Sequence, residues 1–315
     1  MTGSASTPTI SRQSGPGGPE CAPHVTELIR ALPAPRPIPW KFVLLASYVG
    51  VNLVLIPTKI VLGPDVGADW LLFRQLPHAI NDGTIYEIGR PTVWFVWSPV
   101  AAWLMAGVAV LGYWAWAALH VASVLLLRRP LLIGLVLISY AFWFDVAQGN
   151  TATFVFVAGA LALAGSRGAS LVYLGLFLLM PRPLMAPIAV WLLWKDRSLW
   201  RPFAAIFVIH AAMVLASGDA WPWISSLLVY DLAPGITIGP TAWIGRWWLL
   251  AGIPLAAWLT WRRHFGWASL AASPYITPQY LLFVLWEVAP RDQEVDYGPR
   301  RSGVTRAAAA NSRDP

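Results

Sequence analysis

The chain has 315 residues, of which 57% are hydrophobic and 12% charged, and its mean hydropathy is +0.58. Because a soluble domain carries about 25% charged residues, this composition excludes an ordinary soluble globular protein and is typical of a protein embedded in lipid. The formal net charge of +7 does not indicate a nucleic-acid partner, since the basic residues lie mostly between hydrophobic runs and in the tails, where topology and anionic headgroups account for them. We therefore predict an all-α polytopic transmembrane helix bundle of about 8–10 spans.

Two polar tails flank the hydrophobic part of the chain. Residues 1–36 are rich in Ser, Pro and Gly and are predicted to be a disordered cytoplasmic tail, with room for a short helix over 25–32. Residues 37–290 are predicted to form the transmembrane domain, and residues 291–315 a disordered C-terminal tail. The single cysteine, Cys21, excludes an intrachain disulfide. The long polar stretch before the first hydrophobic run predicts a signal anchor rather than a cleavable signal peptide.

The first hydrophobic run, Trp40–Leu62, is long enough to cross a membrane, which takes about 20 apolar residues. By the positive-inside rule the N-terminus is predicted to be cytoplasmic, on the evidence of four basic residues, Arg12, Arg30, Arg36 and Lys41. The loop 63–91 is then extracytoplasmic, while Lys195–Arg197 and Arg262–Arg263 are expected inside. Two arrangements stay open for Arg128–Arg129 and Gln148–Asn150, and positive-inside reasoning favours the arginines inside and Gln148 outside.

Seven further hydrophobic runs follow along the chain: Thr92–Leu127, Leu131–Phe144, Thr151–Ala164, Ala169–Trp194, Pro202–Ala216, Trp247–Trp261 and Phe265–Val288. The first of these is too long for one straight crossing, and Gly112 either divides it into two helices or bends one long path. Met180-Pro-Arg-Pro183 interrupts another run, which is tolerated only where protein or water satisfies the freed backbone groups. Residues 217–245 form a second polar interval, predicted to be extracytoplasmic.

The loop 63–91 is a long polar interval between hydrophobic runs, and loops of this length are usually functional. A short interfacial helix is predicted over Asp69–Ile80, because four apolar residues recur at spacings of three and four: Trp70, Phe73, Leu76 and Ile80. Arg74, Gln75 and His78 point elsewhere, and Pro77 is expected to kink or shorten the helix. Asn81-Asp82-Gly83 then predicts a turn.

Asp69 is the candidate catalytic base of this loop. At the start of a helix that faces a cavity, a carboxylate can accept a proton from an acceptor hydroxyl. The alternative is that Asp69 is only the N-cap of the helix, a position that Asp favours. Asp65 is the competing carboxylate, and its position after Gly63-Pro64 is more typical of a turn residue.

Three arginines are candidates for holding a phosphate, because a guanidinium can bind two phosphate oxygens: Arg74, Arg90 and Arg182. Interfacial anchoring is the favoured explanation for Arg74 and Arg90, whereas Arg182, between two prolines in an apolar run, is costly unless paired or hydrated. Gln148 and Asn150 can hydrogen-bond a sugar or simply form a polar turn. The histidines show no metal-ligand spacing, and His120 and His210 are expected to be satisfied within the bundle. Four tryptophans flank polar loops, where a membrane belt is the default explanation and sugar stacking the alternative: Trp94, Trp97, Trp221 and Trp243.

The order of these motifs resembles glycosyltransferase family 87, the polyprenol-phosphate-mannose-dependent α-mannosyltransferases of the GT-C superfamily. An Asp after the first span is followed by Gly83-Thr-Ile-Tyr86 and by Phe95-Val-Trp-Ser-Pro99 at the start of the next span. Gln148-Gly-Asn150, Arg182-Pro183 and Ser273-Pro274-Tyr275 complete the order. The resemblance covers about residues 69–282; Ser98 stands where Pro is common, and Arg182 replaces the usual Lys.

The resemblance implies a GT-C-like fold in the cell membrane, with the active site on the extracytoplasmic face. It implies an inverting hexosyltransferase that moves a sugar, expected to be mannose, from a polyprenyl-phosphate-linked donor to an envelope glycolipid or glycan. Asp69 would be the base, Tyr86 and the candidates above would bind substrate, and neither cofactor nor metal is expected. The alternatives are a transporter or flippase, in which ionisable residues lie near the bilayer midplane, and a catalytically silent membrane subunit.

Overall fold

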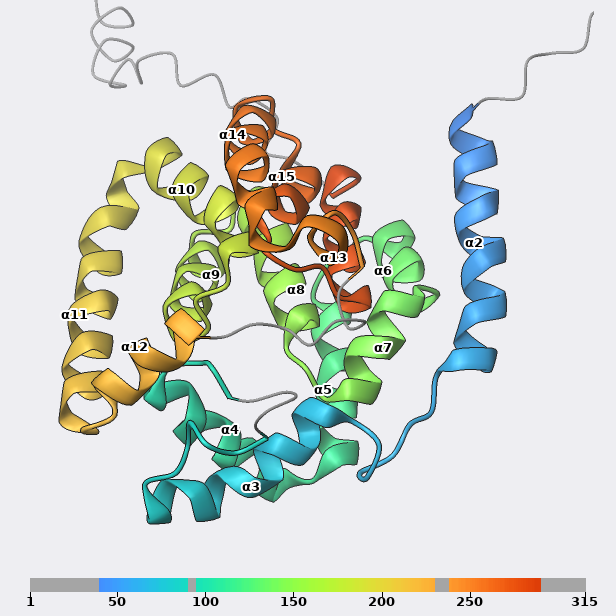
Figure 1. The fold of residues 1–315 in the computed structure, drawn as a ribbon. Helices are drawn as coiled ribbons and strands as arrows, with labels where there is room; N and C mark the ends of the chain where they lie inside the picture. The colour runs from blue at the N-terminus through green and yellow to red at the C-terminus, as the bar shows by residue number, and fades with distance from the viewer. Residues whose placement is uncertain (1–39, 90–94, 230–237, 290–315) are drawn as a thin grey trace, which may run out of the picture. The chain divides into compact units, whose positions relative to one another are not determined.

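The computed structural model describes residues 40–89, 95–229 and 238–289. The chain divides into two units, Met1–Ala46 and Ser47–Pro315; of the first, only the opening turns of one helix are described. All regular elements in the described ranges are helical, which confirms the all-α prediction (Figure 1). The predicted disordered tails, 1–36 and 291–315, and the short helix over 25–32 lie outside these ranges.

In chain order the helices are α2 (Trp40–Lys59), α3 (Ala68–Asp82), α4 (Pro99–Leu111), α5 (Tyr113–Leu125), α6 (Pro130–Leu137), α7 (Tyr140–Gln148), α8 (Ala152–Leu163), α9 (Arg167–Leu179), η1 (Pro183–Met185), α10 (Ala186–Lys195), η2 (Arg197–Leu199), α11 (Trp200–Ala216), α12 (Ala220–Val229), α13 (Thr241–Ile244), η3 (Gly245–Trp247), α14 (Trp248–Trp261), α15 (Phe265–Ala272) and η4 (Pro278–Glu287). Most helices lie within the hydrophobic runs, while α3, α12 and α13 lie in the two polar intervals.

Breaks inside the hydrophobic runs are sharp. Gly112 has φ 86°, and α4 and α5 meet there at a bend of 108°, so the run from Thr92 contains two helices rather than one long path. The run from Leu131 is also divided, into α6 and α7 at 62°. The predicted interruption at Met180–Pro183 is confirmed, because α9 ends at Leu179 and a 3₁₀ turn begins at Pro183. The run from Phe265 contains α15 and η4.

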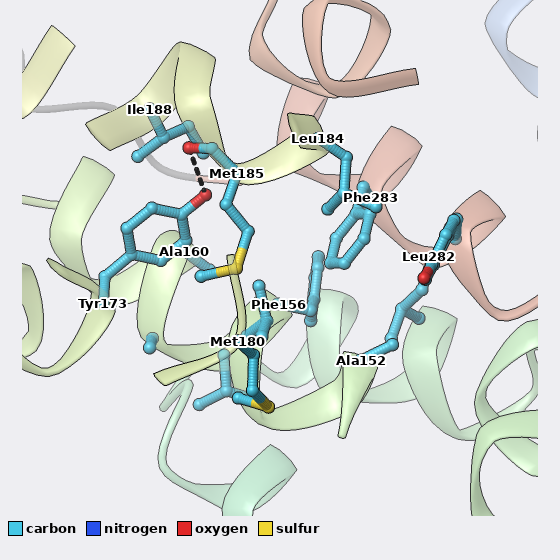
Figure 2. Packing of buried hydrophobic residues seen from close by; sticks show 14 of the residues in the cluster. Ala152, Phe156, Ala160, Tyr173, Met180, Leu184, Met185, Ile188, Leu282 and Phe283 are labelled. Atoms are coloured by element: carbon cyan, nitrogen blue, oxygen red, sulfur yellow. Dashed lines mark hydrogen bonds between the residues drawn. The ribbon is translucent and has the colours of Figure 1, made fainter. Parts of the chain in front are cut away.

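The core is built around α8, a helix that is apolar and almost fully buried on all sides. Phe156 stacks on Trp286 of η4 at 5.9 Å between ring centroids, and the indole of Trp286 donates to the Phe156 carbonyl at 2.9 Å. The Tyr173 hydroxyl donates to the Met185 carbonyl at 3.1 Å and so joins α9 to η1 (Figure 2). These contacts fix the two sides of the Met180–Pro183 break, with Met180, Leu184 and Met185 buried against α8 and η4.

Large apolar side chains are also exposed along many helices. On α11 the exposed residues include Phe207, Val208, Ile209, Met213 and Leu215. Within the described ranges one segment, Arg197–Ala216, is long and apolar enough to cross a membrane, and the number rises to three if each bent pair is one span. Because monomeric soluble proteins rarely expose apolar surface on this scale, these faces are compatible with contact to lipid.

Candidate functional site

The helix predicted in the loop 63–91 is α3. Its apolar stripe is buried, with Trp70 and Phe73 both 1% exposed and Leu76 fully buried. Arg74, Gln75 and His78 are exposed on the other face, as the spacing predicts. The helix continues through Pro77 to Asp82, and Gly83 ends it with φ 68° and an N–H directed at the carbonyl of Ala79. The helix and its closing turn are therefore confirmed, and Pro77 does not shorten the helix.

Asp69 is not the N-cap of α3, so that interpretation is wrong. The N-cap is Gly67, which offers no side chain, and the first free N–H, of Ala68, donates instead to the Gln148 side chain at 3.0 Å. Gln148 thus takes over the capping function from 80 residues away in the sequence. The Asp69 carboxylate is left for a different contact, although its place in the first turn still favours a negative charge.

Two glycines bring α3 against the turn between α7 and α8. A Cβ on Gly67 would lie 2.3 Å from the Ala147 carbonyl oxygen, and one on Gly149 would lie 2.6 Å from the Trp70 Cβ. Gly149 also has φ 73°, a conformation that suits glycine. Any larger residue would push the turn away from α3, so these glycines set the spacing between Asp69 and the residues that follow Gly149.

A chain of side chains then joins Asp69 to Arg182 through one amide. The Asn150 Nδ2 donates to Asp69 Oδ2 at 2.7 Å, and the Asn150 Oδ1 accepts from Arg182 Nη2 at 2.9 Å. The backbone N–H of Thr151 donates to the same Oδ1 at 2.6 Å. Guanidinium and backbone N–H groups only donate, so the Asn150 atom that contacts Arg182 and Thr151 must be the amide oxygen. The amide nitrogen therefore faces Asp69.

Arg182 lies in the break between α9 and η1 and is only 5% exposed. Its guanidinium carbon is 5.1 Å from the ring centroid of Trp97 and 5.7 Å from that of Tyr280, distances typical of cation–π contacts. While Nη2 bonds Asn150, Nη1 is buried and has no hydrogen-bond partner in the described part of the chain. A buried N–H of a charged group is costly to leave unmade, so Nη1 is suited to an anionic ligand.

Behind Asn150 lies a second polar layer that the sequence reasoning missed. The fully buried Asp145 carboxylate accepts from the N–H groups of Ala152, at 3.2 Å, and Thr153, at 2.7 Å, and so caps α8. The His120 Nε2 lies 2.9 Å from the Asn150 carbonyl oxygen and 3.5 Å from Asp145 Oδ2. An acid at the end of an apolar run was the available signal for Asp145, because such acids are rare and usually functional.

The surroundings of Asp69 raise the pKa of its carboxyl group toward neutral pH. Burial raises the pKa of Asp69 to about 6; the positive charge of Arg182 and the Asn150 hydrogen bond lower this pKa, and the charge of Asp145 raises it. Asp69 as a whole residue is half-buried. A carboxylate of this pKa is ionised at neutral pH yet basic enough to accept a proton in a transition state.

Several predicted residues do not join this cluster. Arg74 is exposed and pairs with Asp65 at 2.8 Å. Tyr86 is buried, and its hydroxyl donates to the Trp97 carbonyl at 3.0 Å, so it supports the ring beside Arg182. Arg90 and Trp94 lie outside the described residues. Trp221 and Trp243 are 73% and 87% exposed, whereas Trp97 is buried against Arg182.

The two histidines expected to be satisfied differ. Both ring nitrogens of His120 lie within 2.9 Å of carbonyl oxygens, which confirms that expectation. His210 Nε2 is buried without a hydrogen-bond partner among the described residues, so there the expectation is wrong. The same described ranges contain no group of three His, Cys, Asp or Glu side chains that could hold a metal ion.

Comparison of the chain with protein-family models, with curated proteins and with solved structures found no match.

Proposed function

We propose that this protein is an integral membrane glycosyltransferase that moves a hexose, mannose by family resemblance, from a polyprenyl-phosphate-linked donor to an envelope lipid or glycan. The observation that carries this proposal is the Asp69–Asn150–Arg182 chain. It joins a carboxylate with a near-neutral pKa to a buried arginine that has an unpaired N–H. A base and an anion-binding cation, held close together, are what transfer from a sugar phosphate requires.

In this mechanism Asp69 accepts the proton of the acceptor hydroxyl as that oxygen attacks the anomeric carbon. The bond between the anomeric carbon and the phosphate oxygen breaks, and the electron pair leaves with the polyprenyl phosphate. Configuration at the anomeric carbon is inverted. The leaving group is a stable anion, so it needs charge stabilisation rather than protonation, and Arg182 supplies that charge.

The aromatic rings around Arg182 fit this assignment. Trp97 and Tyr280 contact the guanidinium and limit its motion, while Asn150 fixes one edge of it. The N–H groups of Nη1, which have no partner among the described residues, are then held in place for a phosphate oxygen. An arginine held in this way loses less freedom on binding than a flexible one.

We further propose that the helices form a polytopic bundle of about 8–10 spans in which bent and short helices contribute partial crossings. The exposed apolar faces support embedding in lipid. On this topology α3 and the loop 63–91 lie on the extracytoplasmic face, where a polyprenyl donor can approach laterally through the bilayer. Lipid is then a partner of the protein as well as the solvent of its helices.

Transfer of radiolabelled mannose from polyprenyl-phosphate-mannose tests the proposal. Purified protein in lipid nanodiscs is supplied with donor and a panel of cell-envelope lipids and glycans. The proposal expects labelled product from at least one acceptor, with inverted anomeric configuration. Absence of product across the panel, from protein that binds the donor, would contradict it.

A further inference from the structure

The Asn150 side chain contacts both reactive groups of the proposed site. Its Nδ2 donates to Asp69 and its Oδ1 accepts from Arg182 and from the Thr151 N–H. With a further contact at 3.4 Å from the Thr151 hydroxyl to Oδ1, four hydrogen bonds hold this amide within the protein. It is poorly placed to turn toward a sugar, the function expected for it from sequence.

We propose that Asn150 is a positioning residue that couples anion binding at Arg182 to proton binding at Asp69. When the site is empty, the positive charge of Arg182 favours ionised Asp69 and keeps it a weak base. An anion at Arg182 offsets that charge, so Asp69 binds protons more tightly and becomes a stronger base. Donor binding thereby prepares the carboxylate for the acceptor.

Two charges from neighbouring elements act on Asp69: Arg182 in the break after α9, and Asp145 in α7. His120 of α5 lies behind Asp145. Of these, only Arg182 has a buried N–H without a partner in the described residues. An anion that binds Arg182 therefore changes the net charge acting on Asp69. Asn150 keeps Arg182 and Asp69 at a fixed separation.

Reciprocity turns this coupling into a measurable quantity. If an anion raises the proton affinity of Asp69, protonation of Asp69 must strengthen anion binding by the same factor. Affinity for the anion should then rise as the pH falls through the pKa of Asp69, near 6 in the empty site. An anion that does not itself titrate in this range reports the coupling without confusion.

Sulfate is the probe, with the protein in uncharged phosphatidylcholine nanodiscs at constant ionic strength. We expect radiolabelled sulfate to bind on the order of tenfold tighter at pH 5 than at pH 8, which corresponds to a pKa change of about one unit. Arg182→Gln should abolish this binding. Asp69→Asn should remove the pH dependence, and Asn150→Leu should reduce it to less than about threefold. Asp65→Asn, a change of the neighbouring carboxylate that pairs with Arg74, should leave it intact.

A second measurement covers the chance that Asn150→Leu does not fold. In the unmodified protein, the infrared band of the Asp69 carboxyl group, assigned by its absence in Asp69→Asn, should titrate at higher pH with sulfate present. The inference is overturned if sulfate binding is independent of pH, keeps its pH dependence in Asp69→Asn, or survives Arg182→Gln. Unchanged coupling in folded Asn150→Leu also overturns it.

This inference rests on the proposed function only for the identity of the natural anion. If sulfate binding depends on pH as expected but no sugar is transferred, the glycosyltransferase proposal fails and the coupling stands. If sugar is transferred but sulfate binding does not depend on pH, the coupling fails and the glycosyltransferase proposal stands.

Discussion

Arg182 has the most unusual surroundings of any residue in the site. Two aromatic rings and one amide hold a buried guanidinium, yet one of its nitrogens lacks a hydrogen-bond partner in the described part of the chain. Burying a charge without full pairing costs several kcal/mol in effective terms. An incompletely paired buried charge is usually found where a bound ligand completes the pairing. Donor binding should therefore depend strongly on the Arg182 side chain.

Replacement of Arg182 tests that expectation. Arg182→Gln should weaken binding of a polyprenyl-phosphate sugar by at least about tenfold, because loss of a charge-assisted hydrogen bond costs about 1.5–3 kcal/mol. Arg182→Lys should retain part of the affinity, since Lys supplies the charge without the planar fork. Equilibrium binding of labelled donor measures both.

Arg74→Gln is the matched control. Arg74 is also on the polar side of this region but is exposed and paired with Asp65, so donor affinity should not change. Equal losses in the Arg74 and Arg182 variants would show that the effect is one of net charge, and the assignment of Arg182 would then be wrong.

At the scale of elements, the site depends on how closely α3 meets the turn after α7. Gly149 combines a left-handed backbone with contact to Trp70, and Gly67 approaches the Ala147 carbonyl. These features hold Asp69 within hydrogen-bond distance of Asn150 across 81 residues of sequence. The position of the carboxylate is therefore a property of two backbones, and small changes there should act on activity before they unfold the protein.

Gly149→Ala should lower sugar transfer by at least about tenfold, because a shift of about 1 Å in a catalytic group is enough for such a loss. Gly83→Ala is the control: Gly83 has φ 68°, close to the 73° of Gly149, but a Cβ there meets nothing within 4 Å. Both variants should lose about 1–3 kcal/mol of stability from backbone strain, and Gly149→Ala should lose more because its Cβ overlaps the Trp70 Cβ. Thermal unfolding measures the loss of stability, and transfer assays measure the loss of activity. Similar activities in the two variants would count against the positioning role of Gly149.

The sequence predicts α3 well because its signal is local. Trp70, Phe73 and Leu76 share one face, and Gly83 supplies the left-handed closing turn. The break at Met180–Pro183 is equally local, since proline cannot continue a helix. Residue type also singled out Asp69 and Arg182.

The contacts between those residues were not predictable from the same information. The Gln148 side chain replaces the N-cap of α3 from a distant helix, and periodicity within one segment contains no record of its tertiary partners. The same limit applies to Asp145 and His120, whose contacts run between α5, α7 and the start of α8. Asn150 stays a predicted site residue, and its side chain contacts Asp69 and Arg182.

At the scale of the whole molecule, the proposal requires α3 and Arg197 to lie on opposite sides of the membrane. The prediction follows from the distribution of Arg and Lys between loops. Single cysteines in a Cys21→Ala background report the side through labelling by a membrane-impermeant maleimide. His78→Cys should react in intact cells and Arg197→Cys only after permeabilisation; both positions are exposed on the protein. The opposite pattern would put the site in the cytoplasm, away from an extracytoplasmic donor.

The stability of the protein also bears on Asp69. Its folded pKa, about 6, is above the ordinary value of 3.8, so the folded state holds this proton more tightly than the unfolded state does. Ionisation of Asp69 therefore costs stability as the pH rises through this interval, and the cost is fully present above about pH 6. Asp69→Asn removes that cost, so the thermal midpoint of this variant at pH 8 should be at or above that of the unmodified protein. If it is, a loss of sugar transfer in Asp69→Asn cannot be attributed to unfolding.

The most direct test of the account is the rate of sugar transfer by Asp69→Asn beside Asp65→Asn. Asn keeps the size of Asp69 and can still contact Asn150 but cannot accept a proton at neutral pH. The account predicts normal folding and at least about a hundredfold slower transfer for Asp69→Asn, the lower end for general-base catalysis. Asp65→Asn removes a carboxylate that is exposed and paired with Arg74, and should keep most of the activity. Full activity in Asp69→Asn, or loss of transfer in Asp65→Asn alone, would contradict the assignment of Asp69 as the base.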